Sequence, residues 1–228
     1  MNKKQIGALF DLDGVVIDTE GVYSRFWEDI EKKYPTGIPD FAVKIKGTNL
    51  NSIMSHYTDP VAKAAVLDAL AEFEKTMVYE IFPDAERFLK ELKAAGVPCA
   101  MVTSSGEMKL QRLFAQQPHL KGYFDAIVSG EMVSHSKPHP ECFLKGAEMI
   151  GCRAEDCVVF EDSLLGVASG KAAGAKVVAL PTTFPDTIRT TAADLFIDSF
   201  AGFTVENFLS LLNSQPLKSL HTRACEAI

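Results

Sequence analysis

The stretch Leu9–Glu20 reads LFDLDGVVIDTE, and the rest of the chain is organised around it. It begins within the apolar run Ile6–Phe10, which is typical of a buried strand. Asp11 and Asp13 follow, and residues two apart in an extended chain point to the same side. Gly14 then permits a sharp change of direction. The stretch therefore predicts paired carboxylates at the carboxyl end of a strand, where they can meet a hard cation or an oxyanion.

The bulk composition is that of a globular chain and sets limits on partners. Of the 228 residues, 47% are hydrophobic and 23% charged, and the formal net charge is -7. This acidic balance disfavours a nucleic-acid partner. No apolar run approaches the roughly 18 residues of a membrane span, and the first residues lack the long apolar region of a signal peptide. We expect a cytoplasmic protein with no nucleic-acid or membrane partner, either a monomer or a weak homodimer.

The five cysteines do not suggest a disulfide framework. Their number is odd and no C-x-x-C spacing occurs. Cys99 and Cys157 lie inside apolar runs, where buried thiols are expected. This usage is typical of a reducing compartment.

Residues 18–81 read as a block of helices without a good strand. Apolar residues recur at helical spacing over 21–34 and again over 60–79. A shorter helix is expected over 50–57, after a loop at 44–49. The block follows directly on the first strand, so the pattern predicts an inserted helical unit.

From Pro83 onwards the chain alternates between helices and strands. Asp84 is expected to cap the first of these helices. Strands are expected at 97–102, 125–129, 157–160, 175–180 and near 195–197, with helices at 84–95, around 110–114, 140–150, up to 174 and 205–212, and a polar loop at 130–140. Such alternation predicts an α/β fold with a parallel sheet covered on both faces. Residues 217–228 show no clear period and are expected to form a loose tail.

Polar residues follow the predicted strands at the points where a parallel sheet would gather them. Four carboxylates crowded together repel one another unless a cation lies among them, and Mg²⁺ suits oxygen ligands. A fixed positive charge and a hydroxyl beside backbone N–H groups can bind phosphate oxygens. The residues are Asp11 and Asp13 after the first strand, Thr103 and Ser104 after the second, Lys137 in the loop beyond the third, and Glu161 and Asp162 after the fourth.

Given a bound phosphate ester, the two aspartates can divide the chemistry. Asp11 can attack phosphorus as a nucleophile and form an aspartyl-phosphate. Asp13 can protonate the leaving oxygen and then accept a proton from the hydrolytic water. Uncatalysed hydrolysis of phosphate monoesters is so slow that a combination of nucleophile, metal and acid–base catalysis is expected.

Four segments of the chain together resemble the motifs of the haloacid dehalogenase-like (HAD) superfamily. They are DLDGV at 11–15, Thr103-Ser104-Ser105, SKPHPE at 136–141 and FEDSLLGV at 160–167. The branch that looks most similar contains sugar phosphatases and β-phosphoglucomutase. The resemblance implies a Rossmann-like core formed by 1–17 and 82–228, with 18–81 as a helical cap that closes over the substrate and selects it. It also implies Mg²⁺ bound by Asp11, the backbone carbonyl of Asp13, Asp162 and Glu161.

Within this superfamily, several positions favour a phosphatase that acts on small phosphorylated metabolites, with sugar phosphates expected. Haloacid dehalogenases proper and phosphonatases lack the second aspartate of the first motif, which this chain has as Asp13. The mutase-like pattern usually has a histidine where this chain has Tyr23, and an arginine for a second phosphate where it has Leu50. Hydrolysis is therefore favoured over the alternative of a phosphosugar mutase. Substrate contacts are expected from the cap loop, at Lys46, Gly47, Thr48 and Asn49.

Two functions of another class compete with an enzyme. A response-regulator receiver also combines paired acids, an acceptor aspartate and a lysine, but it is usually about 120 residues long and lacks a cap. A degenerate HAD protein would bind sugar phosphates as a sensor, yet here every motif residue is present. His135 and His139 flank Lys137 in a polar loop, and a structural role is favoured for them because no zinc-type ligand set is spaced around them.

Overall fold

The computed structural model describes residues 5–213, and the predicted tail at 217–228 lies outside the described residues. Its centre is a six-stranded sheet in the order β3-β2-β1-β4-β5-β6. Every neighbouring pair of strands in this sheet is parallel. The strands are β1 Gly7–Phe10, β2 Cys99–Val102, β3 Ala126–Val128, β4 Cys157–Glu161, β5 Lys176–Ala179 and β6 Leu195–Phe196. The predicted α/β class and parallel sheet are confirmed.

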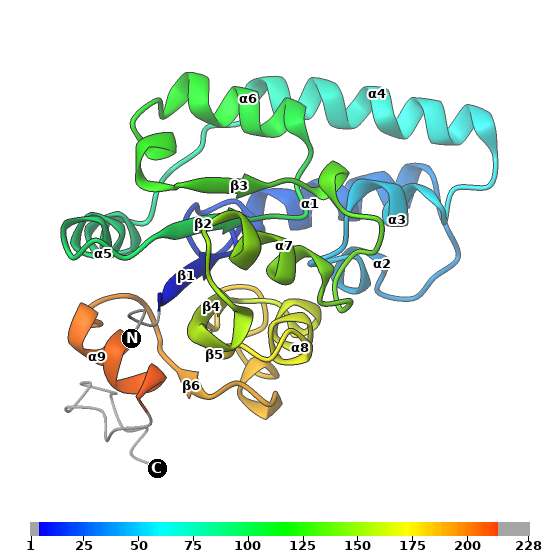
Figure 1. The fold of residues 1–228 in the computed structure, drawn as a ribbon. Coiled ribbons are helices and arrows are strands. Elements are labelled where there is room, and N and C mark those ends of the chain that lie inside the picture. The colour runs from blue at the N-terminus through cyan, green and yellow to red at the C-terminus, as the bar shows by residue number, and fades with distance from the viewer. Residues whose placement is uncertain (1–4, 214–228) are drawn as a thin grey trace, which may run out of the picture.

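Helices connect the strands and form a separate group after β1 (Figure 1). The group between β1 and α5 comprises α1 Glu20–Lys33, α2 Phe41–Lys44, α3 Leu50–Met54 and α4 Pro60–Thr76. The remaining α-helices are α5 Pro83–Ala94, α6 Glu107–Gln116, α7 Glu141–Met149, α8 Leu164–Ala172 and α9 Val205–Leu212. Short 3-10 turns occupy Leu120–Tyr123, Gly130–Met132, Ala154–Asp156 and Ile188–Thr190.

Three local details differ from the sequence expectations. Helix α2 was not predicted, because a helix of only four residues is too short to show a period. The polar loop at 130–140 begins with a 3-10 turn. Asp84 is not the N-cap of α5, since the helix already begins at Pro83 after Phe82. Asp84 instead lies in the first turn, where a negative charge favours the helix dipole.

Two hydrophobic layers cover the two faces of the sheet. Successive residues of β1 point to opposite faces, so Ala8 and Phe10 join one layer and Leu9 the other. The first layer contains side chains of α5, α6 and α9, and the second contains side chains of α7 and α8. Both faces of the sheet are therefore buried, as the continuous apolar runs of the strands predict.

An aromatic cluster lies directly before the ends of the two central strands. The rings of Phe10 in β1 and Phe160 in β4 stack with centroids 4.6 Å apart. Phe88 of α5 and Phe200 pack against both of them. Such pairs add to the stabilisation that burial provides. The residues that follow Phe10 and Phe160 therefore extend from a rigid base.

The helices α1 to α4 pack around a hydrophobic cluster of their own. Trp27, Phe41, Ile53 and Leu70 are among its buried residues. Two chain segments join this helical group to the sheet and run antiparallel, with a bridge between Ile17 and Ile81. The backbone N–H of residue 18 donates to the carbonyl of residue 80 at 2.9 Å, and that of residue 82 donates to residue 16 at 3.0 Å.

The described part of the chain contains no helix that is long and apolar enough to span a bilayer. Cys99 and Cys157 are 1% and 0% exposed, which confirms the prediction that these thiols are buried.

Candidate active site

Three predicted carboxylates meet beyond the ends of the two central strands. β1 lies between β2 and β4, so the strand order reverses there, and crevices at such points are the usual ligand sites of parallel sheets. Asp11 follows β1, Glu161 ends β4 and Asp162 comes next. All three are buried, and each offers an oxygen within 4.8 Å of the others. The oxygen atoms of these residues form a set that suits a hard cation.

Two glycines make this close approach possible. Gly14 has φ +75°, and a Cβ on it would lie 1.8 Å from an Asp162 carboxylate oxygen. A Cβ on Gly166 in α8 would lie 1.8 Å from Oε1 of Glu161. Any other residue at either position would push a carboxylate out of the site.

Lys137 supplies the positive charge of the buried carboxylate group. Its Nζ lies 2.6 Å from Oδ1 of Asp11 and 2.5 Å from Oε1 of Glu161. Burial alone would lower the pKa of Lys137, but the charges of Asp11 and Glu161 outweigh burial and raise it. The ammonium group is therefore charged at neutral pH and fixes the orientation of Asp11.

Glu161 uses its other oxygen to hold the start of α8. Oε2 accepts hydrogen bonds from the backbone N–H groups of Asp162 and Ser163 at 3.0 and 2.9 Å, and from the Ser163 hydroxyl at 3.0 Å. Both oxygens of Glu161 are thus engaged with the protein. Through these contacts Glu161 positions Asp162, Ser163 and Lys137.

The crowding of carboxylates shifts the pKa values of the site. Burial raises the pKa of Asp11 to about 8, with the charges of Glu161 and Asp13 adding to the effect of burial and Lys137 opposing it. Burial, followed by the charges of Glu161 and Asp11, also raises the pKa of Asp162 well above its usual range, although Thr183 donates to it. A divalent cation would remove this repulsion.

Thr103 and Ser104 follow β2 and line the same cavity as Asp11. Thr103 is 3% exposed, and its hydroxyl oxygen accepts the N–H of Ser105 at 3.0 Å. The Ser104 hydroxyl donates to the carbonyl of Gly47 at 3.0 Å. Ser104 therefore connects the strand end to the helical group.

Asp13 is held by three donors from separate parts of the chain. Lys109 Nζ lies 2.5 Å from Oδ1, the Thr19 hydroxyl donates to the same oxygen, and the Ser105 hydroxyl donates to Oδ2 at 2.8 Å. Burial on its own raises the pKa of Asp13, but the charge and hydrogen bond of Lys109, together with the hydrogen bonds of Thr19 and Ser105, outweigh burial, and the pKa falls below its usual value. Asp13 is therefore a carboxylate in this arrangement.

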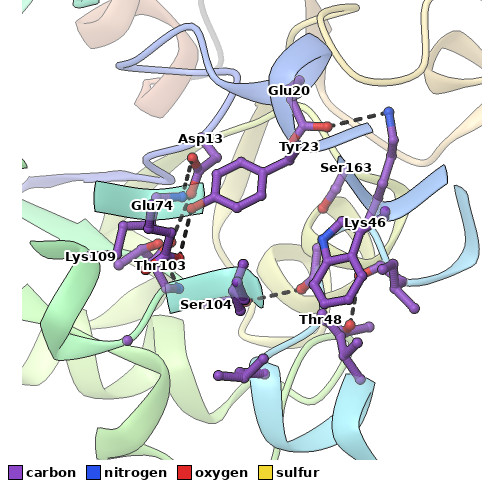
Figure 2. A pocket seen from close by; sticks show the side chains of 18 of the residues that line it. Asp13, Glu20, Tyr23, Lys46, Thr48, Glu74, Thr103, Ser104, Lys109 and Ser163 are labelled. Atoms are coloured by element: carbon purple, nitrogen blue, oxygen red, sulfur yellow. Dashed lines mark hydrogen bonds and ion pairs between the residues drawn. The ribbon is translucent and has the colours of Figure 1, made fainter. Parts of the chain in front are cut away.

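Lys109 belongs to a polar network that joins α6 to the helical group. Its Nζ lies 4.3 Å from the centroid of the Tyr23 ring, and Figure 2 shows Asp13, Lys109 and Glu74 gathered around that ring. The Tyr23 hydroxyl donates to Oε1 of Glu74 at 2.9 Å, and Arg112 donates to Oε2 at 2.7 Å. The sequence reasoning noted Tyr23 but missed Lys109, Glu74 and Arg112, because charged residues on amphipathic helices usually face solvent.

The predicted substrate loop lies at the opposite wall of the cavity. Lys46, Gly47 and Thr48 line it, and Nζ of Lys46 is 3.3 Å from Oε2 of Glu20. The Thr48 hydroxyl donates to a backbone carbonyl within the loop at 2.6 Å. The side chain of Asn49 caps α3, since its oxygen accepts the N–H of residue 52 at 2.9 Å.

His135 and His139 lie in an exposed loop, with ring centroids 4.5 Å apart. Nδ1 of His135 lies 2.8 Å from Oε2 of Glu141. The Glu141 carboxylate also accepts the backbone N–H groups of residues 134 and 135. These contacts support the start of α7 beside Lys137.

Comparisons with known proteins agree with the motifs and with this geometry. A family model described as haloacid dehalogenase-like hydrolase matches residues 7–174. Hexitol phosphatase A of Escherichia coli (strain K12) is 32% identical over 207 residues, which cover 87% of this chain and 93% of that protein. The bifunctional riboflavin kinase/FMN phosphatase of Arabidopsis thaliana is 32% identical over 215 residues, covering 88% of this chain but only 55% of the longer relative.

A solved structure shows the same fold. The HAD hydrolase of family IA, variant 3, from Entamoeba histolytica aligns with a TM-score of 0.77 over 92% of this chain and 100% of that chain, at 22% identity. The resemblance inferred from the four sequence motifs is therefore confirmed. By the extent of the family match, this chain belongs to the haloacid dehalogenase-like hydrolase family.

Proposed function

We propose that the protein is a Mg²⁺-dependent phosphatase that hydrolyses small phosphorylated metabolites through an aspartyl-phosphate. The observation that carries this proposal is the buried set of Asp11, Glu161 and Asp162 with Lys137 among them, beside a cavity large enough for a metabolite. The two relatives named above are, by their names, phosphatases of hexitol phosphates and of FMN.

The residues fit Mg²⁺ by their chemistry. Asp11 and Asp162 offer carboxylate oxygens that burial and mutual repulsion leave poorly stabilised as anions. We assign these two side chains and the backbone carbonyl of Asp13 as ligands, with Glu161 holding Asp162 in place. The ion would neutralise charge on the phosphoryl oxygens.

The protein groups can then carry the reaction in two steps. An oxygen of Asp11 bonds to phosphorus, the bond from phosphorus to the alcohol oxygen breaks, and Asp13 gives a proton to that oxygen. In the second step Asp13 removes a proton from water, whose oxygen attacks phosphorus and releases Asp11 and inorganic phosphate. Lys137, Thr103 and backbone N–H groups near Ser104 are assigned to the phosphoryl oxygens.

The protonation of Asp13 sets a condition on the first step. The pair with Lys109 favours the carboxylate, which suits the base required in the second step. A bound phosphate brings negative charge close to Asp13 and so raises its pKa towards the acid form. Substrate binding therefore favours the protonated form of Asp13, which can donate the proton that the leaving group needs.

We infer that residues 18–81 act as a cap on a core formed by 1–17 and 82–228. The two chain segments bridged at Ile17 and Ile81 supply the two crossings about which such a cap can turn. Lys46 and Thr48 line the cavity on the cap side and are assigned to substrate contacts, together with Gly47 and Asn49. We also propose a cytoplasmic location and a monomer or weak homodimer.

Hydrolysis is favoured over phosphoryl transfer between two ends of a sugar. Leu50, at the position where the mutase-like pattern has an arginine, lines the cavity with an apolar side chain. A mutase must bind phosphate at both ends of its substrate, and Leu50 cannot contribute to that.

Incubation with phosphate esters tests the proposed function. We expect Mg²⁺-dependent release of inorganic phosphate from p-nitrophenyl phosphate and from a panel of phosphorylated metabolites, and loss of that release with excess EDTA. β-Glucose 1-phosphate belongs in the panel, because formation of glucose 6-phosphate from it would establish a mutase. A protein that binds phosphate esters but releases no phosphate would be a sensor or a phospho-switch.

The stability of the metal-free protein should fall as the pH rises from about 4 to about 8. The pKa of Asp11 rises from 3.8 to about 8 on folding, so the folded state binds more protons than the unfolded state in this window. The raised pKa values of Asp162 and Glu20 act in the same direction. Mg²⁺ replaces the proton, so a Mg²⁺ concentration on the order of 100 times its dissociation constant should raise the melting temperature more at pH 8 than at pH 5. Equal increments at the two pH values would contradict the assigned ligands.

A further inference from the structure

The cavity between the sheet and the helical group has two chemically different halves. Its volume is about 360 Å³, within the range of sites that enclose a whole small ligand. The half next to the strand ends is polar and contains Asp11, Asp13, Thr103 and Asp162. A phosphate ester bound there would direct its alcohol part into the other half, towards α1, α3 and α4.

The outer half is lined mainly by apolar side chains of the helical group. These are Trp27, Ile45, Leu50, Ile53, Leu67 and Leu70. Leu67 lines the cavity and is 37% exposed. The ring of Tyr23 also lines the cavity and lies next to Asp13 and Lys109 at the edge of the polar half (Figure 2).

Two of the carboxylates that line the cavity already have partners in the protein. Glu74 accepts hydrogen bonds from Tyr23 and Arg112, and Glu20 pairs with Lys46. A sugar that entered this half would place several hydroxyl groups against apolar side chains, and each hydroxyl left without a partner costs about 1–3 kcal/mol. A polyhydroxylated alcohol is therefore a poor match for this wall.

A flat ring with a polar edge matches the same wall well. Its faces can pack against Trp27 and the aliphatic side chains, as aromatic groups do. One guanidinium nitrogen of Arg112 contacts Glu74, and a guanidinium has five N–H donors in all. Arg112 can therefore serve one polar edge of a ligand, whereas a sugar needs partners for hydroxyl groups on several sides. Arg112 is 20% exposed at its side chain and lines the cavity.

We propose that the alcohol part of the substrate carries a planar heterocycle, as in a nucleoside 5′-phosphate, and that hexose phosphates are poor substrates. This inference rests on the proposed phosphatase function and names the substrate class of the same site. It departs from the expectation of sugar phosphates drawn from the sequence. The substrate class depends on which side chains line the cavity, and the sequence alone does not reveal that lining.

Two ribose phosphates provide the kinetic test, because one carries a heterocycle at the anomeric carbon and the other a hydroxyl group. Uridine 5′-monophosphate and ribose 5-phosphate present the same phosphate on the same kind of primary alcohol carbon. We expect kcat/KM for uridine 5′-monophosphate to exceed that for ribose 5-phosphate by at least about tenfold, as expected for binding of an apolar group in a matching pocket. Ribose 5-phosphate or glucose 6-phosphate hydrolysed as well as the nucleotide would overturn the inference and leave the phosphatase function standing. No phosphate release from any ester, p-nitrophenyl phosphate included, would overturn the proposed function itself.

Two leucines of equal exposure provide matched variants. Leu67 of α4 lines the cavity, and Leu209 of α9 lies elsewhere; both are 37% exposed. Leu67→Gln should lower kcat/KM for uridine 5′-monophosphate by about three- to tenfold and change that for ribose 5-phosphate by less than about twofold. Leu209→Gln should change neither. Equal losses for both esters in Leu67→Gln would overturn the inference.

The only tryptophan of the chain gives a readout that needs no turnover. Trp27 lines the cavity, and the sequence contains one tryptophan. In the Asp11→Asn variant, whose folding is verified by its melting transition, uridine 5′-monophosphate should change the fluorescence of Trp27 with saturation, and inorganic phosphate or ribose 5-phosphate should change it much less. Nucleotide binding without a change in Trp27 fluorescence would overturn the placement of the ring.

Discussion

Replacing Asp11 with asparagine is expected to lower kcat by at least about 10⁴-fold while the chain stays folded. Asp11 follows β1 and carries the carboxylate that we assign as the nucleophile. An asparagine amide keeps the shape of the side chain but attacks phosphorus poorly. Release of inorganic phosphate from p-nitrophenyl phosphate and from an alkyl phosphate, each with Mg²⁺, measures the loss.

The same substitution should leave the melting temperature of the metal-free protein unchanged or higher. Burial and the neighbouring carboxylates raise the pKa of Asp11, so the amide relieves repulsion in the site. Lys137 keeps Glu161 as a partner at 2.5 Å. Mg²⁺ should then stabilise the wild type but have little effect on the variant. Asp29→Asn, on a side chain that is 76% exposed, is the matched control and should behave as the wild type. A folded Asp11→Asn protein with near-normal turnover would rule out the covalent route.

The fold followed from the sequence because its strands are buried on both faces. Runs such as residues 157–160 are apolar throughout, and the helices between them have clear periods and glycine ends. Such signals depend on local residues only. The predictions that were wrong are local too. Helix α2 was missed because it has four residues, and Asp84 was expected to cap α5, but that helix already begins at Pro83. Neither failure affects the order of the strands.

The strand-end residues of the site were predictable for the same reason. A parallel sheet brings the carboxyl ends of its strands to one edge, so Asp11, Thr103 and Asp162 had to lie near one another. Lys109 was not predictable from one sequence. It lies four residues before Leu113 on the same buried face of α6, where a lysine normally indicates solvent. Its burial is explained by the contacts with Asp13 at 2.5 Å and with the Tyr23 ring.

Residues that bind the alcohol part of the substrate are the least predictable of all. The apolar residues of α1, α3 and α4 read as helix core in the sequence, and several of them do belong to the hydrophobic cluster of the helical group. Trp27 and Leu70 serve both purposes, since they pack in that cluster and also line the cavity. Helical spacing describes the first role and contains no information about the second.

Replacing Asp13 with asparagine is expected to affect the two chemical steps unequally, according to the leaving group. An alkoxide needs a proton to leave, so loss of the acid should lower kcat for an alkyl phosphate by about 10²–10⁴-fold. p-Nitrophenolate is a weak base and leaves without that proton, so the attack by Asp11 should be much less impaired. The second step still lacks the base that removes a proton from water. Mixing the variant with p-nitrophenyl phosphate should therefore release about one p-nitrophenol per active site in a burst, followed by slow turnover.

The burst separates a chemical role of Asp13 from a structural one. Asp13 also binds Lys109, Thr19 and Ser105, so its loss could disturb the cavity through those contacts. A disturbed cavity would slow the alkyl and aryl esters by the same factor and give no burst, because attack by Asp11 would be slowed as well. Asp68→Asn, an exposed change on α4, controls for the substitution itself and should leave both esters unaffected. Equal losses for the two esters without a burst would therefore contradict the acid–base assignment. A burst of p-nitrophenol together with a larger loss for the alkyl ester requires that Asp13 acts both on the leaving oxygen and on water.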